Sequence, residues 1–152
     1  MQKVNVTLKE GNHEFMFVTA WIGIINLKNG RMCCTNAGHL CPMIRANGED
    51  FKLYRDPHAT ALGVFPKKQF NEYELQLQPG DSLFVYTDGI PEAMNPKEEQ
   101  YGLDRLREAL NREKDASMEA LAGCVANDVK GFQGDADQFD DITMLAFRYL
   151  GE

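Results

Sequence analysis

Three aspartates in this sequence stand where apolar segments end or begin. The apolar residues 83–86 lead through Thr87 to Asp88, which Gly89 follows directly. Asp140 and Asp141 stand immediately before another apolar segment, residues 142–150. Carboxylates at the tips of strands with buried side chains are suited to binding or catalysis, so these acids are the first candidates for chemistry.

The two apolar segments bring Asp88 and Asp140 to one rim of a sheet if they form antiparallel neighbouring strands. Carboxylates that close repel each other, and a hard divalent cation removes the repulsion. Mg²⁺ and Mn²⁺ take oxygen ligands and keep several waters, so a few aspartates on rigid strands suffice. Gly89 lets the backbone approach closely and is predicted to contribute to the ion site.

Each acid also has a simpler interpretation. An aspartate in a Thr-Asp-Gly sequence is often only a turn former, and Asp140 or Asp141 can simply begin a strand. Asp135 and Asp137 extend the acidic segment, although a solvated loop explains them equally well.

The elements that must position these acids are mostly strands in the first half of the chain. Asn29-Gly30 and Asn47-Gly48 are each flanked by strand-like segments, which is typical of hairpins with type I′ turns. The nearly continuous apolar run 15–25 indicates a central strand that is covered on both faces. Residues 72–88 are predicted to be a third strand pair, joined at the Pro-Gly-Asp turn 79–81.

The second half of the chain changes to a helical period. Leucines recur along residues 102–113, and apolar residues recur along 117–132, where Ser117 is a predicted N-cap. Gly131 and Gly134 are expected to end this helical stretch. Strands followed by helices and a last strand predict an α+β fold with mainly antiparallel sheets.

Composition restricts the class of protein. The chain has 152 residues, of which 43% are hydrophobic, which is enough for one domain. A formal net charge of −7 argues against nucleic-acid binding. No segment has the form of a signal peptide or a membrane span, and the four cysteines lack metal-site spacing, so we expect a cytoplasmic protein with free thiols.

Several motifs together make the sequence recognisable. "NAGH" at 36–39, "YTDG" at 86–89 and "DDIT" at 140–143 occur in an order and at spacings that resemble the bacterial metal-dependent serine/threonine phosphatases. The resemblance is to the sporulation stage II E and sigma-B-regulator branch of the protein phosphatase 2C superfamily. It extends over residues 15–149, and the second and third motifs are fairly specific in combination.

The resemblance implies a β-sandwich flanked by helices, with two Mn²⁺ or Mg²⁺ ions that activate a water for attack on phosphoserine or phosphothreonine. Asp88 and Asp140 match two of the family's metal ligands. Asp141 stands where the wider superfamily often has asparagine, so a supporting role is expected for it. The implied substrate is a phosphorylated anti-anti-sigma factor or a similar phosphoprotein.

One motif of the family is missing. An early Gly-Asp motif, whose aspartate bridges both metals, precedes the strands in the family, but residues 1–14 contain no aspartate. We therefore expect residues 1–152 to be a single phosphatase-like domain that forms the C-terminal part of a larger catalytic domain. This chain alone is expected to have little or no activity, and its unpaired sheet edges favour a homodimer or a swapped assembly.

Two other functions fit the same sequence. The first is a non-catalytic regulatory module of the same fold that uses the rim for protein contacts. The second is a cation-binding module without catalysis. An upstream Gly-Asp-x-x-Gly-His-Gly motif would favour the phosphatase.

Overall fold

The computed structural model describes residues 1–10 and 12–151, and the chain forms two compact units. The first unit consists chiefly of Met1–Leu40 and Arg55–Leu77. The second unit consists of Cys41–Tyr54 and Gln78–Leu150. Each unit therefore combines stretches that are separated in the sequence.

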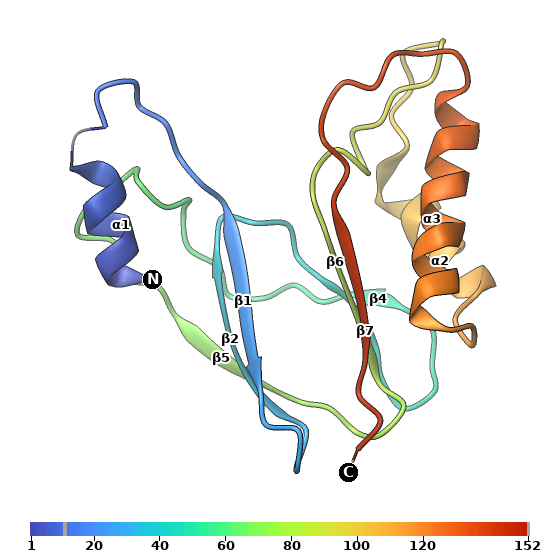
Figure 1. Ribbon diagram of the computed structural model, residues 1–152, viewed down its shortest axis with the longest axis horizontal. Coiled ribbons are helices and arrows are strands. Elements are labelled where there is room, and N and C mark those ends of the chain that lie inside the picture. The colour runs from blue at the N-terminus through green and yellow to red at the C-terminus, as the bar shows by residue number, and fades with distance from the viewer. Residues whose placement is uncertain (11, 152) are drawn as a thin grey trace. The chain divides into compact units, whose positions relative to one another are not determined.

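The first unit contains one antiparallel sheet of three strands in the order β1-β2-β5 (Figure 1). Its elements are α1 (Gln2–Lys9), β1 (Ala20–Ile25), β2 (Arg31–Ala37) and β5 (Glu72–Gln76). Side chains along β2 alternate between exposed and buried, as expected for a strand with one covered face.

The adjacent cysteines of β2 follow this alternation. Cys33 is exposed and Cys34 is buried, and both are free thiols, as are Cys41 and Cys124. Cys33 and Cys34 therefore point to opposite faces of the sheet, as neighbours along a strand do. Burial, the largest cause, raises the pKa of the Cys34 thiol to about 12, because a thiolate loses hydration there.

The prediction of a central strand over residues 15–25 is wrong. The strand β1 begins only at Ala20, and β2 is its one strand neighbour among the described residues. Ile24 is 71% exposed and Phe15 is 81% exposed. An apolar run shows that a segment is suited to burial, but a strand becomes central only when strands pair with both of its edges.

The two Asn-Gly pairs adopt different turns. Asn47 and Gly48 both have positive φ, at 54° and 72°, as a type I′ turn requires. At the other pair only Gly30 has positive φ, at 70°, and the Asn26 amide closes a longer loop by donating to the Arg31 carbonyl. The predicted hairpin β1–β2 is confirmed, but its type I′ turn is not.

The second unit contains a four-stranded antiparallel sheet in the order β4-β3-β6-β7 (Figure 1). Its strands are β3 (Met43–Arg45), β4 (Lys52–Leu53), β6 (Ser82–Tyr86) and β7 (Met144–Arg148). Two helices, α2 (Gly102–Arg112) and α3 (Met118–Gln133), pack against each other, and α3 also contacts β7.

The helices of the second unit bury one apolar stripe each. Leu106 and Leu110 of α2 are fully buried, and Leu121, Val125 and Val129 of α3 are buried at the same spacing. The predicted cap of α3 is confirmed, since the Ser117 Oγ accepts a hydrogen bond of 3.1 Å from the Ala120 amide. The helix continues through Gly131 and ends at Gln133, before Gly134.

The predicted pairing of residues 72–76 with residues 82–86 is wrong. The strand β5 pairs with β2, whereas β6 pairs with β3 and β7. The Pro-Gly-Asp segment does redirect the chain, but the partner of each strand is decided by long-range pairing. The α+β class with mainly antiparallel sheets is confirmed, and no helix of the described residues combines the length and apolarity needed to span a bilayer.

Candidate metal centre

The register of β6 and β7 brings the predicted acids to one end of the second unit's sheet. Tyr86 is opposite Met144 in this antiparallel pair, and the Thr87 amide donates to the Thr143 carbonyl at 3.0 Å. Asp88 therefore leaves β6 at the end where residues 140–141 approach β7. The antiparallel arrangement that the sequence analysis proposed for these two segments is confirmed.

Gly89 lies against the backbone of Asp140 and Asp141. A methyl group built on Gly89 would lie 2.5 Å from the Asp141 carbonyl oxygen and 3.3 Å from that of Asp140. No side chain fits at those distances, so only glycine allows the turn after β6 to touch the segment before β7. The contact joins Asp88 to Asp140 and Asp141 through adjacent backbone.

Two polar side chains hold the acidic segment in place. The Thr87 Oγ1 donates to the Asp141 carbonyl at 2.9 Å and accepts from the Thr143 amide at 3.0 Å. The Gln138 Nε2 donates to the Asp140 carbonyl at 2.8 Å. The segment is thus fixed by its backbone, which leaves most carboxylate oxygens available to a ligand.

The carboxylates of this rim have few partners among the described residues. Asp88, Asp140 and Asp141 are all exposed, and none of them is in an ion pair with a described residue. The Asp140 Oδ1 accepts from the Asp141 amide at 2.7 Å. Like charges on one rim repel each other, and a divalent cation would offset that repulsion.

The donor set fits Mg²⁺ or Mn²⁺ in type, because carboxylate oxygens are the ligands that these hard ions prefer. The set contains few carboxylates. Within the described part of the chain, neither Asp88 nor Asp140 belongs to a group of three ligand atoms that all lie within 4.8 Å of one another. The rim therefore offers two or three carboxylates to an ion whose other ligands are waters or further groups.

A very different aspartate lies in the first unit. The Asp56 side chain is fully buried, and its Oδ2 accepts hydrogen bonds from the Tyr73 hydroxyl at 2.7 Å and the Asn36 amide at 2.9 Å. The Trp21 Nε1 donates in turn to the Tyr73 hydroxyl at 2.8 Å. Burial and the hydrogen bond to Asp56 raise the pKa of Tyr73 far above its ordinary value.

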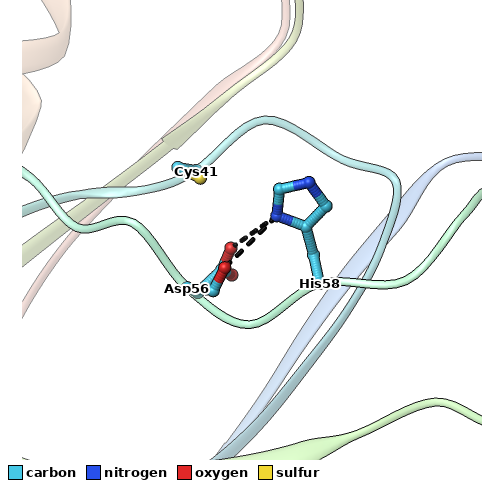
Figure 2. A group of neighbouring side chains, drawn as sticks. All are labelled: Cys41, Asp56 and His58. Atoms are coloured by element: carbon cyan, nitrogen blue, oxygen red, sulfur yellow. Dashed lines mark hydrogen bonds and ion pairs between the residues drawn. The ribbon is translucent and has the colours of Figure 1, made fainter.

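The ring of His58 extends this network toward solvent. Its Nδ1 lies 3.3 Å from the Asp56 Oδ1, while the side chain remains 47% exposed (Figure 2). Residues 36–39, the NAGH motif, form a turn in which the Asn36 Oδ1 accepts from the His39 amide at 2.8 Å. These contacts tie the turn, the strand β5 and the segment after Arg55 together.

Sequence reasoning found the acids of the rim but missed the residues that support them. Thr87 lies within the YTDG motif, but nothing in the sequence indicates that its hydroxyl donates to the acidic segment, and Gln138 carries no periodic or motif signal. Asp56 was missed entirely, because a charged residue between Arg55 and Pro57 resembles part of a surface loop. Asp135 and Asp137 lie in the exposed loop after α3, as the solvated interpretation expects.

A family model and a curated relative both match most of this chain. The model of the family described as stage II sporulation protein E matches residues 1–150. Protein IcfG of Synechocystis sp. is 36% identical over 131 residues, which are 86% of this chain and 20% of that protein.

Solved structures share the fold. The RsbU and RsbW domains of Rv1364c from Mycobacterium tuberculosis align with a TM-score of 0.73 and 19% identity, over 97% of this chain and 40% of that one. The phosphatase domain of SpoIIE from Bacillus subtilis, in a manganese-soaked crystal, aligns with a TM-score of 0.65 and 18% identity, over 86% and 56%. This chain thus spans a fifth of the curated relative and about half of the solved chains.

Proposed function

Because this chain belongs to the family of stage II sporulation protein E, we propose that it forms part of a metal-dependent phosphatase domain that hydrolyses phosphoserine or phosphothreonine in a regulatory protein. The observation that supports this most directly is the shared rim of Asp88, Asp140 and Asp141 at one end of β6 and β7. The family model that matches the chain and the placement of the acids both favour the same chemistry.

Asp88 and Asp140 are the proposed ligands of Mn²⁺ or Mg²⁺, with two ions in the complete domain. A bound ion of this kind lowers the pKa of water toward neutrality and offsets the charge of phosphoryl oxygens. The chain's own residues orient the ligands. Thr87 and Gln138 hold the acidic segment by its backbone, and Gly89 keeps the two strand ends in contact.

The proposed substrate is a phosphorylated anti-anti-sigma factor or a similar phosphoprotein. The exposed rim is compatible with a protein substrate, because a phosphorylated side chain on another molecule can approach exposed carboxylates and their ions without entering a deep pocket. The predicted homodimer stays a prediction. The strand β1, in which Ile22 and Ile24 are exposed, is one of the described edge strands at which such pairing could occur.

A non-catalytic regulatory module is the second candidate. The observation that favours it is the small ligand set, since no close group of three ligand atoms includes Asp88 or Asp140 in the described part of the chain. Two carboxylates hold an ion weakly, whereas a bridged pair of ions needs a bridging carboxylate.

The test is Mn²⁺-dependent hydrolysis of p-nitrophenyl phosphate by the longest native form of the protein and, in parallel, by residues 1–152 alone. We expect activity in the longer form, little in the shorter one, and a loss of about 100-fold or more with Asp88→Ala. Asp104→Ala is the matched control, because Asp104 is an exposed acid of α2 that pairs with Arg107 instead of facing the rim. Activity that survives Asp88→Ala would remove the ligand role, and absence of activity in both forms would favour the regulatory module.

A further inference from the structure

A hollow of about 410 Å³ lies beside the proposed metal centre, between the end of α3 and the loop that leads to β7. Gln138 and Ile142, which flank the acidic pair Asp140-Asp141 in sequence, both line it. Gln138 is also the residue whose Nε2 donates to the Asp140 carbonyl. The hollow and the metal centre therefore share one wall.

The charge of this hollow is opposite to that of the rim. Among the described residues that line it, Lys130 is the one with a charged side chain. No described carboxylate forms an ion pair with Lys130, in contrast to Lys52 and Lys114, which pair with Glu49 and Asp50. An ammonium that has no ion-pair partner among the described residues can form a charge-assisted contact with an anionic group of another molecule.

Lys130 also has a structural explanation. It stands in the last turn of α3, where a cation interacts favourably with the helix dipole. That interaction does not use the three N–H donors of the ammonium, so they remain available to a ligand. The amide side chains of Gln133 and Gln138, which line the same hollow, add further hydrogen-bonding groups.

We infer that this hollow is a recognition subsite for an anionic side chain of the phosphoprotein substrate, close to the phosphorylated residue. The inference rests on the proposed phosphatase function. When the phosphoryl group lies at the rim, a neighbouring carboxylate or second phosphate of the substrate enters the hollow and pairs with Lys130. Phe139, which is 75% exposed between Gln138 and Asp140, offers an apolar contact to the same segment.

This subsite selects among substrates without taking part in the hydrolysis itself. An ester too small to reach the hollow gains nothing from Lys130, whereas a peptide with an acidic neighbour gains one charge-assisted contact. Such a contact contributes a few-fold to about tenfold in affinity at a partly exposed site. The expected signature is thus a change in KM that depends on the flanking residue of the substrate.

The experiment uses the longest native form of the protein with three phosphoserine peptides, whose flanking residues are alanine, glutamate or a second phosphoserine. We expect KM to be about fivefold to tenfold lower for the glutamate peptide, the doubly phosphorylated peptide or both, relative to the alanine peptide. Lys130→Gln should abolish that difference and leave hydrolysis of p-nitrophenyl phosphate unchanged. Lys52→Gln is the matched control, because it removes the same charge from a lysine that is already paired with Glu49.

The outcomes separate this inference from the function on which it rests. Equal KM values for the three peptides, or an equal effect of Lys130→Gln on all substrates, would overturn the subsite while leaving the phosphatase intact. If no ester is hydrolysed, the proposed function fails. Fluorescence anisotropy of the labelled peptides then decides the subsite by itself, since preferential binding that Lys130→Gln removes supports it and equal binding overturns it.

Discussion

Asp56 in the first unit and Asp88 in the second are both aspartates, but their surroundings are opposite. Asp56 is completely buried, and Asn36 and Tyr73 donate hydrogen bonds to its carboxylate. Asp88 is exposed, and no described residue forms an ion pair with it. A buried carboxylate with matched donors holds a fold together, whereas an exposed carboxylate near other acids is available to a cation.

The comparison extends to the residues around each acid. Around Asp56 the side chains themselves are the donors, so the network is closed by the protein. At the rim, Thr87 and Gln138 bind the backbone of the acidic segment and leave its carboxylates largely unused. Thr87 and Gln138 thus position the acids of the rim without donating hydrogen bonds to their carboxylates. This difference distinguishes a candidate ligand site from a structural hydrogen-bond network.

The largest expected difference between the two acids is in stability. Asp56→Ala leaves the buried Asn36 amide and Tyr73 hydroxyl without their acceptor, which should lower the free energy of unfolding by about 3 kcal/mol. Asp88→Ala should change it by less than about 0.5 kcal/mol, because Asp88 is exposed. Urea unfolding followed by Trp21 fluorescence reports on the first unit, and far-UV circular dichroism reports on both.

The contrast between Asp56 and Asp88 is contradicted if the two variants are equally stable. A loss of stability in Asp88→Ala would show that the rim acid is part of a structural network after all.

The next effect concerns the backbone contact at the rim. Gly89→Ala places a methyl group 2.5 Å from the Asp141 carbonyl oxygen, so one of the two backbone segments must shift. We expect a loss of about 1–3 kcal/mol in stability. We also expect an increase of about tenfold in the Mn²⁺ concentration needed for half-maximal activity, because the ligands no longer keep their relative positions.

Gly123→Ala is the matched control for this change. Gly123 lies within α3, and a methyl group there has no neighbour within 4 Å, so the substitution should stabilise the helix by about 0.5–1 kcal/mol. Normal Mn²⁺ dependence in Gly89→Ala would show that the contact does not position the ligands.

The last comparison is between two tyrosines, Tyr73, which is half-buried in the first unit, and Tyr86, which is buried in the second. Tyr73→Phe removes both the donor to Asp56 and the acceptor for Trp21, which should cost about 2 kcal/mol of stability. The Tyr86 hydroxyl is buried and makes no hydrogen bond to any described residue, so Tyr86→Phe should be neutral or stabilising by up to about 1 kcal/mol.

The same urea experiment measures both tyrosine variants. Destabilisation of the Tyr86→Phe protein by as much as the Tyr73→Phe protein would mean that the Tyr86 hydroxyl has a partner that the described residues do not include.

Local features of this protein could be predicted from its sequence. The period of apolar residues predicted the two helices and the last strand, Ser117 predicted the start of α3, and Asn47-Gly48 predicted a type I′ turn, which positive φ at both residues confirms. The acids at the ends of β6 and β7 were also found, because each follows or precedes an apolar segment directly. These signals are carried by residues close together in the chain.

Tertiary structure decided the strand partners and the buried polar network. It paired β5 with β2 and not with β6, it left β1 at an edge among the described strands, and it buried Asp56 among donors that lie 17 and 20 residues away. The physical reason is that strand partners and buried polar networks depend on which distant segments meet. Sequence alone fixed which residues suited burial, turns or metal binding, and only the folded chain determined their neighbours.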